Sequence, residues 1–255
     1  MTEESFRYRP KVPEVTLAFW IVKVLATTLG ETGGDAVSMS MNLGYAIGTA
    51  AFAVVFLFAV TLQVRAARFH ASLYWFAIIA STTVGTTLAD LATRDIGIGY
   101  AGGSLLLAGL LAASLLAWRR ATGSVSIREL TTRRAEVFYW VTIMFSQTLG
   151  TALGDWVADD DGGLGLGYGR AAVIFGAAIA AVAGLYFASR VSRTALFWAA
   201  FVLTRPLGAV VGDLLDKPHA KGGLELSRYS ATAALCVLIV LMLVTFRQRA
   251  AETAH

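Results

Sequence analysis

The sequence predicts an all-α polytopic membrane protein with eight transmembrane helices. Of its 255 residues, 56% are hydrophobic and only 15% are charged, and the mean hydropathy is +0.65. A soluble globular domain carries about 25% charged residues. The charges here fall largely between long uncharged stretches, each close to the ~20 residues that a spanning helix needs. Composition therefore argues against a soluble enzyme, a nucleic-acid-binding protein and a secreted disulfide scaffold.

The apolar stretches are long and continuous, so a helix satisfies their backbone hydrogen bonds inside a bilayer better than the strands of an outer-membrane barrel. We expect spans at residues 15–33, 43–62, 73–91, 98–118, 137–156, 168–188, 195–214 and 229–246.

The basic residues predict the orientation of these spans. Fourteen of the 21 Lys and Arg residues lie in the two terminal segments or in the loops on the same side, and five lie on the other side. By the positive-inside rule both termini are cytoplasmic, and we expect the bacterial inner membrane as the location. The two remaining basic residues, Lys23 and Arg205, fall inside predicted spans.

An internal repeat organises the chain. Four segments align without gaps: WIVKVLATTLGETGGD from Trp20, WFAIIASTTVGTTLAD from Trp75, WVTIMFSQTLGTALGD from Trp140 and WAAFVLTRPLGAVVGD from Trp198. In each, Gly follows Trp by ten residues and Asp follows Gly by five. The unit is a helix pair. We therefore divide the chain into a cytoplasmic segment, four repeats and a cytoplasmic tail, at residues 1–14, 15–62, 70–118, 135–188, 193–246 and 247–255.

Four tandem two-helix units with one such Trp apiece resemble a family of bacterial membrane-anchored proteins built from four copies of a repeat of unknown function. The resemblance covers nearly the whole chain and implies the same topology, but it supplies no substrate or site residue. Because each unit holds an even number of spans, the four units should be parallel around an axis along the membrane normal. Two pseudo-dimers are the competing arrangement. The Trp residues should lie in the interfacial aromatic belt.

One Asp in each repeat lies near the outer end of its first span. A carboxylate there opposes the negative end of the helix dipole, at a cost of roughly 0.3–1 kcal/mol that a cation would remove. We therefore expect four acids at one depth as a cation site, and the alternative is that each merely ends a helix in the wet interface. The acids are Asp35, Asp90, Asp155 and Asp213.

A polar stripe runs inward from these acids, because the positions seven and eight before each Asp lie near one helical face. The layer seven before Asp contains Thr28, Thr83, Thr148 and Pro206. The layer eight before Asp contains Thr27, Thr82, Gln147 and Arg205. The layer four before Asp contains Glu31, Thr86, Thr151 and Ala209. Hydroxyls in spanning helices often bond their own backbone, so packing is the alternative role of the threonines. The glycines at positions 30, 85, 150 and 208 should permit close helix approach.

Charges at membrane depth cost at least ~2.5–3.5 kcal/mol each and therefore face partners or pathways. Lys23, Thr27 and Glu31 are spaced four apart and lie on one face, and Arg205 occupies the layer of Thr27. The spacing predicts an ion pair between Arg205 and Glu31. Its role is either in an ion or proton pathway or in closing the ring between the first and last repeats.

These features predict an integral membrane transporter of a cation, such as divalent manganese, with possible proton coupling. The ion-pathway residues would be the intramembrane Lys23, Glu31 and Arg205, the Thr27, Thr82 and Gln147 layer, and the four Asp. The four Asp and Glu31 are candidate metal ligands. The alternatives are a scaffold or sensor, or a transporter of a small organic or anionic solute. We expect no enzyme activity, no cofactor beyond a bound divalent cation, and the lipid bilayer and a small ion as partners. Nucleic acid is not expected, and an oligomer is possible.

Overall fold

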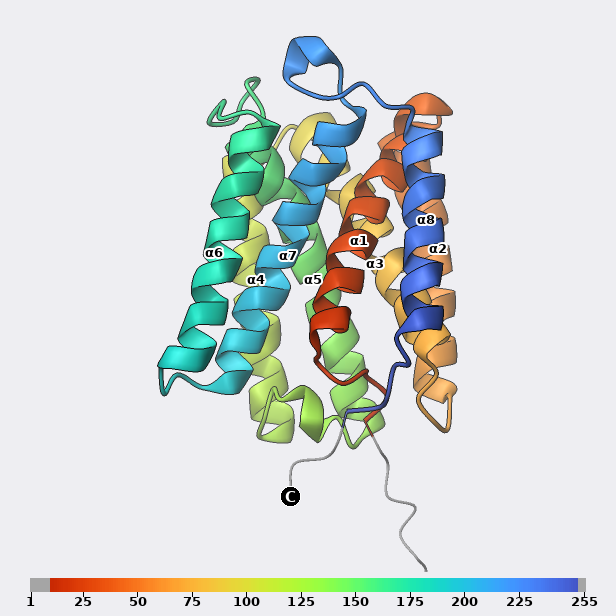
Figure 1. Cartoon of the computed structure of the whole chain (residues 1–255), viewed down its shortest axis with the longest axis vertical. Coiled ribbons are helices and arrows are strands. Elements are labelled where there is room, and N and C mark those ends of the chain that lie inside the picture. The colour runs from red at the N-terminus through yellow and green to blue at the C-terminus, as the bar shows by residue number, and fades with distance from the viewer. Residues whose placement is uncertain (1–9, 252–255) are drawn as a thin grey trace, which may run out of the picture.

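A computed structural model describes residues 10–251 of the chain. Within them it contains eight long α-helices (Figure 1). Their bounds are Leu17–Asp35 (α1), Gly44–Arg65 (α2), Ala71–Asp90 (α3), Tyr100–Thr122 (α4), Arg133–Ala158 (α5), Tyr168–Ala188 (α6), Arg193–Asp216 (α7) and Arg228–Thr245 (α8). Each predicted span overlaps one of these helices and differs from it by a few residues at the ends.

Three of the odd-numbered helices begin with a side-chain cap. The hydroxyls of Thr16, Thr132 and Ser192 accept hydrogen bonds from backbone N–H groups in the first turns of α1, α5 and α7. Such caps satisfy one of the amide groups that a helix start leaves without a partner. They place the start of each helix immediately before its apolar stretch.

The odd-numbered helices form an inner ring. Helix α1 packs against α3 and α7, and α5 packs against the same two helices, so the four contacts close on themselves. Each even-numbered helix lies outside and packs on the first helix of the following repeat: α2 on α3, α4 on α5, α6 on α7, and α8 back on α1. The first and last repeats are therefore joined by the same kind of contact as consecutive repeats.

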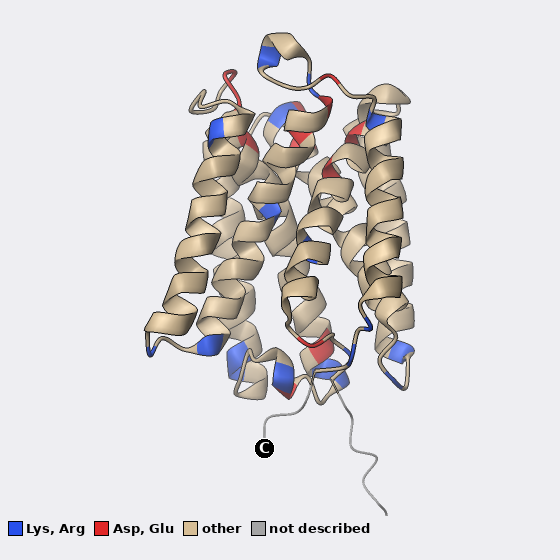
Figure 2. Ribbon diagram, viewed as in Figure 1, with Lys and Arg blue, Asp and Glu red and all other residues tan. Residues whose placement is uncertain are grey.

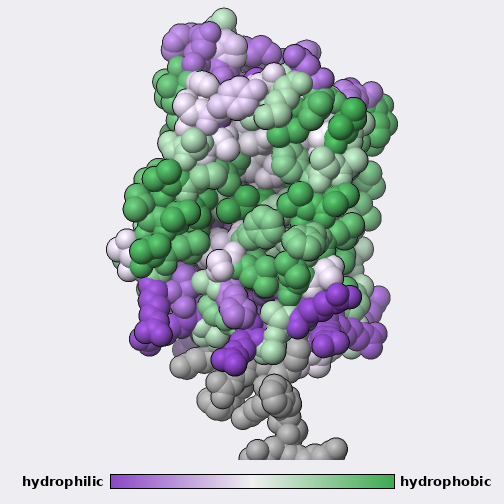
Figure 3. Space-filling view, turned by 90° about the vertical axis from the view of Figure 1, so that its right-hand side faces the viewer, coloured by the Kyte–Doolittle hydropathy of each residue, from purple (hydrophilic) through white to green (hydrophobic). Residues whose placement is uncertain are grey.

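The outer surface of the bundle is apolar. A band of hydrophobic side chains lies between two more polar ends on the face shown in Figure 3. Among the described residues, six helices are long and apolar enough to cross a membrane: α2, α3, α4, α6, α7 and α8. The chain is thus a helical membrane protein. Helices α1 and α5 fall outside this set because the polar residues that they bury inside the ring lower their mean hydropathy. Among these residues are Lys23, Glu31 and Gln147.

The two described chain ends meet at the end of the bundle that carries most of the Lys and Arg residues (Figure 2). Pro13 and Ala250 form an isolated antiparallel bridge, and the backbone N–H of Ala251 donates to the carbonyl of Val12. The buried Lys11 ammonium donates to carbonyls at the end of α2 and pairs with Glu136 at 2.7 Å. Arg7 and Arg9, which contributed to the predicted orientation, lie outside the described residues.

The tryptophans differ from the interfacial belt that the sequence predicts. Trp75, Trp140 and Trp198 are buried, with 1%, 2% and 5% of their surfaces exposed. They pack edge-on or tilted against neighbouring rings, including Tyr74 and Tyr139. The Tyr74 and Tyr139 hydroxyls share a hydrogen bond of 2.7 Å. The prediction was wrong for these residues because the bundle buries the inward ring faces in an aromatic cluster instead of exposing them to lipid headgroups.

Candidate functional site: a charged axis inside the helix ring

The four repeated Asp residues lie in the last turns of α1, α3, α5 and α7, which end on the side of the bundle opposite the described chain ends (Figure 1). All four are buried, at 1–2% exposed. Asp35 and Asp90 are the last residues of α1 and α3, and each is followed by a short π-helical turn, Ala36–Ser40 or Leu91–Asp95. Helices α5 and α7 continue for three residues past Asp155 and Asp213. The acids therefore lie in the last turns of the ring helices, as predicted, but in α5 and α7 they do not end the helix.

Arg94 joins two of these acids. Its guanidinium lies 3.0 Å from the Asp90 carboxylate, one helical turn earlier, and 3.1 Å from Asp155 of the next repeat. Asp159 approaches it at 3.7 Å and also accepts a hydrogen bond from the Tyr100 hydroxyl at 2.9 Å. We call these residues the Arg94 cluster. It connects the C-terminal ends of α3 and α5.

Lys217 joins the other two acids. It pairs with Asp213, four residues earlier, at 3.0 Å, and with Asp35 of the first repeat. Arg228 lies 2.7 Å from Asp216 and 3.8 Å from Asp35. We call these residues the Lys217 cluster. Burial alone would lower the pKa of Lys217, but the nearby carboxylates outweigh that effect and raise the pKa well above its ordinary value.

This end of the bundle still carries more acidic than basic side chains. In these two clusters, six carboxylates face three basic side chains among the described residues. The carboxylate oxygens of Asp35, Asp213 and Asp216 lie within 4.8 Å of one another, a spacing that suits one metal ion. Lys217 is already in contact with two of these acids, so a metal ion there would have to replace its ammonium group.

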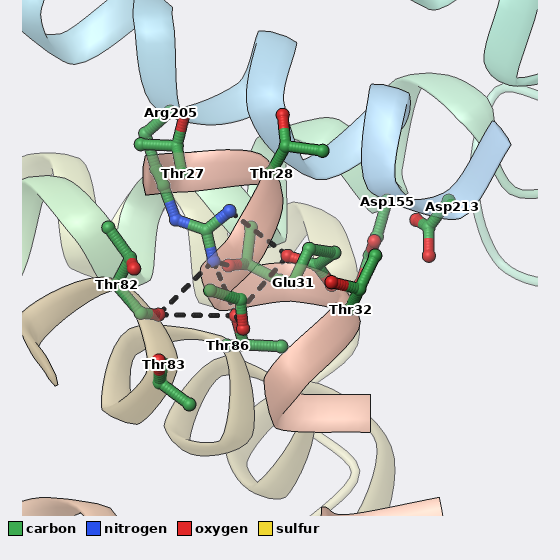
Figure 4. Close-up of polar contacts among 12 residues, drawn as sticks. Thr27, Thr28, Glu31, Thr32, Thr82, Thr83, Thr86, Asp155, Arg205 and Asp213 are labelled. Carbon is green, nitrogen blue, oxygen red and sulfur yellow. Dashed lines mark hydrogen bonds and ion pairs between the residues drawn. The ribbon is translucent and has the colours of Figure 1, made fainter. Parts of the chain in front are cut away.

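Arg205 lies inside the ring and contacts every repeat (Figure 4). Its guanidinium pairs with Glu31 of α1 at 3.0 Å, as the sequence predicted. It also donates to the Thr86 hydroxyl at 2.6 Å, to the Thr82 carbonyl at 3.4 Å and to the Thr151 hydroxyl. None of the Arg205 surface is exposed. The guanidinium of one repeat is therefore held by side chains or backbone of the other three.

The polar layer eight residues before each Asp contributes to helix contacts. The Thr27 hydroxyl donates to backbone carbonyls of its own helix and, at 3.2 Å, to the carbonyl of Thr204 in α7. The Thr82 hydroxyl similarly reaches the carbonyl of Ala26 at 3.1 Å. Gln147 donates to Ser81 at 3.4 Å. These hydroxyls and this amide thus join neighbouring ring helices, which is the packing role that the sequence left open.

The repeated glycines lie where the ring helices come closest. A Cβ atom added at three of them would fall 2.0–2.2 Å from an atom of the next ring helix, and at the fourth 3.0 Å from one. Each glycine faces the residue eight before Asp in the following repeat, and the last repeat faces the first. The pairs are Gly30 with Thr82, Gly85 with Gln147, Gly150 with Arg205, and Gly208 with Thr27.

Lys23 is the predicted site residue that the structure leaves without a partner. Its side chain is fully buried, and the ammonium lies 4.2 Å from the centre of the Phe201 ring. The ammonium donates no hydrogen bond to any residue that the structure describes.

The basic residues of the two outer clusters were missed as site residues. Arg94 and Lys217 were counted only as loop charges that report orientation. A signal for them was present, because each follows the repeated Asp of its own unit by four residues, a spacing that favours an ion pair on a helix.

A comparison with protein-family models gives a match over most of the chain. The family is described as Repeat of Unknown Function (DUF347), and its model matches residues 18–69, 73–124, 138–192 and 196–250. The four matches coincide with the four repeats recognised in the sequence. No curated protein and no solved structure matches the chain.

Proposed function

We propose that this chain, which belongs to the family defined by the Repeat of Unknown Function, is an integral membrane transporter whose cargo path follows the axis of the inner ring. The observation that carries the proposal is the set of charged side chains buried within that ring. Arg205, Glu31 and Lys23 are 0%, 3% and 0% exposed. Charges at such depth are costly, and in membrane proteins they mark pathways for ions or solutes.

The proposal includes the arrangement in the membrane. All eight helices would span the bilayer as four parallel repeats around a pseudo-symmetry axis, with both termini in the cytoplasm and the acidic clusters on the outer side of a bacterial inner membrane. The asymmetry of Lys and Arg supports this orientation. The closed series of contacts from α1 through α3, α5 and α7 supports the axis.

A cation is the first candidate cargo, and a divalent ion such as manganese fits the chemistry of the outer end. Hard cations prefer carboxylate oxygens, and the two clusters hold more carboxylates than basic groups. A cation that binds there would replace Arg94 or Lys217 as the partner of these carboxylates. Asp35, Asp213 and Asp216 are the acids whose oxygens lie close enough together to share it.

Arg205 would then close the path below the acids. Its guanidinium lies on the buried side of α7 and is bound to the other three ring helices. Transfer of a proton to Glu31 would remove the countercharge of Arg205 and weaken this closure, which is how proton movement could be coupled to cargo movement.

A small organic or anionic solute is the second candidate cargo. The observation that favours it is the buried pair of cations, Lys23 and Arg205, of which the described residues give only Arg205 a carboxylate partner. A carboxylate or phosphate group of a solute could bind between them.

Transport by purified protein in liposomes tests the proposal. Uptake of Mn²⁺ is followed with an internal metal-sensitive dye, for the parent and for Asp35→Asn and Asp155→Asn at matched protein amounts. Asn keeps the shape and removes the charge, so both variants should insert normally and lose most uptake. Asp160→Asn, at an exposed position of the outer loop, is the matched control and should transport like the parent.

Three outcomes separate the alternatives. If the parent moves no Mn²⁺ but exchanges small anions, the second candidate replaces the first. If it moves none of the tested ions, the scaffold or sensor function replaces transport. Normal uptake by both Asn variants would show that these acids are not part of the path.

A further inference from the structure

Lys23 lies in an otherwise apolar layer inside the ring. The residues at its position in the other three repeats are Ile78, Ile143 and Phe201. All four side chains are completely buried. The Lys23 ammonium faces the Phe201 ring at 4.2 Å, a cation–π contact that offsets only part of the cost of removing an ammonium from water.

The charges inside the ring do not balance. Two basic side chains, Lys23 and Arg205, are fully buried within the ring. Glu31 pairs with Arg205 at 3.0 Å. No carboxylate among the described residues forms an ion pair with Lys23, so a protonated Lys23 leaves one positive charge uncompensated. A single negative charge would correct the imbalance.

Several buried hydrogen-bond donors at this level also lack an acceptor. Besides the Lys23 ammonium, the buried donors that have no partner in the described part of the chain include Arg205 Nε, Thr142 Oγ1 and Ser146 Oγ, as well as the indole Nε1 groups of Trp75 and Trp140. In the repeat alignment Thr142 comes one residue before the Lys23 position and Ser146 three after it, and Arg205 follows Phe201 by four. All of them therefore lie within about one helical turn of the Lys23 layer. Buried donors of this kind normally have partners.

We propose that the Lys23 layer binds one small monovalent anion, held by the Lys23 ammonium and by donors from Arg205, Thr142 and Ser146. One negative charge completes the charge balance, and a small acceptor completes the hydrogen bonds. The other residues of the layer, Ile78, Ile143 and Phe201, are uncharged, so none of them competes with Lys23 for the anion. Chloride and nitrate are small anions that carry this single charge.

The site has a consequence for the proposed path, although it does not depend on transport. A cation that passed the outer acids would meet two positive charges, Lys23 and Arg205, at the next levels of the ring. A bound anion neutralises one of them and lowers this electrostatic barrier. The bound anion would therefore allow a cation that has passed the acids to pass the layer of Lys23 as well.

Thermal unfolding of the purified full chain in detergent tests for the anion. Sodium chloride and sodium nitrate are titrated against sodium gluconate at constant ionic strength, because gluconate is too large for the layer. Chloride or nitrate should raise the Tm steadily with the logarithm of its concentration, by roughly 5–10 °C at a hundredfold excess over the dissociation constant. Lys23→Met removes the charge with little change in length and should abolish the rise. Lys221→Met, at an exposed loop position, should keep it.

Two further results make the test decisive. Ser146→Ala removes only a donor, so the rise in Tm should begin at a higher chloride concentration. This variant covers the case in which Lys23→Met does not fold. A Tm of the parent that is the same in chloride, nitrate and gluconate would overturn the proposal and identify Lys23 as a neutral amine. An equal chloride effect in Lys23→Met and the parent would also overturn it. No transport is measured, so failure here is distinct from failure of the proposed function.

Discussion

Replacing Gly208 with Ala tests whether the ring closes between the last and first repeats. A Cβ atom at this position would lie 2.1 Å from Thr27 Oγ1, 2.5 Å from Thr27 Cβ and 2.9 Å from the backbone carbon of Thr27. Rotation of the Thr27 side chain relieves only the first of these contacts. Because the backbone carbon is also too close, helices α1 and α7 have to move apart.

The expected size of the effect follows from two opposing terms. Ala is a better helix former than Gly by about 1 kcal/mol. Overpacking of a tight core typically costs about 1–3 kcal/mol, and a clash with backbone belongs at the upper end of that range. We therefore expect Gly208→Ala to lower the free energy of unfolding by about 1–2 kcal/mol, which corresponds to a fall in Tm of roughly 2–8 °C for a chain of this size.

The assay is thermal unfolding in detergent, with Gly176→Ala of the outer helix α6 as the matched control. Nothing lies within 4 Å of a Cβ added at Gly176, so this variant should be as stable as the parent or slightly more stable. Gly85→Ala should fall between the two, since its nearest contacts are 3.0 Å, to the backbone carbon and Cβ of Gln147. If Gly208→Ala unfolds at the same temperature as Gly176→Ala, the close approach of α1 and α7 is refuted.

Three other substitutions test the charged residues. Glu31→Gln should lower the Tm in detergent by several degrees, because loss of one partner of a buried pair costs up to about 3–5 kcal/mol; an unchanged Tm would mean that Arg205 does not need its countercharge. Lys217→Met should be less stable than the parent by a constant amount up to about pH 10, the ordinary lysine pKa. Folding raises the pKa of Lys217, so its contribution to stability is complete below the pKa of the unfolded chain and is lost only as the pH rises toward the pKa of the folded chain. If the parent and Lys217→Met were equally stable at pH 9, this reasoning would be contradicted. Arg94→Gln should lower the Tm more at low than at high sodium gluconate, because the Arg94 side chain is 28% exposed and salt screens it; equal losses would place its contribution elsewhere.

The repeat made much of the interior predictable from the sequence. Once four segments shared one register, residues at equal positions had to lie at similar levels, and the cost of a buried charge required Arg205 to find an acid. Glu31 was the acid one layer away on another ring helix, and the pair is present at 3.0 Å. The glycines were likewise predicted to allow close approach, because small residues in spanning helices do so.

Other features depend on three-dimensional contacts that the repeat pattern does not encode. The sequence predicted Thr27 and Thr82 as pathway residues, but it did not show that their hydroxyls also reach carbonyls of the neighbouring ring helix, because this depends on how the helices pack. The partners of Arg94 and Lys217 on the following ring helix depend on the same packing. The tryptophans were assigned by depth alone, whereas their burial depends on the direction in which each helix faces.

The charges and the glycines divide the ring in different ways. The glycine contacts occur between all four pairs of neighbouring ring helices. Among the described residues, the ion pairs at the acidic end of the bundle join neighbouring ring helices in two places, since Arg94 joins α3 to α5 and Lys217 joins α7 to α1. The close glycine contacts thus occur four times around the ring, and these ion pairs occur twice.

This twofold charge pattern determines how the transport variants are to be interpreted. Asp35 belongs to the Lys217 cluster and Asp155 to the Arg94 cluster, so Asp35→Asn and Asp155→Asn each remove one carboxylate from a different cluster. If cargo passes along a common axis, both clusters contribute to the same local potential and both variants should lose uptake to a similar extent. If uptake is lost in only one variant, the cargo binds at that cluster. The Lys217 cluster is the expected one, because three of its carboxylates lie close enough together to share an ion.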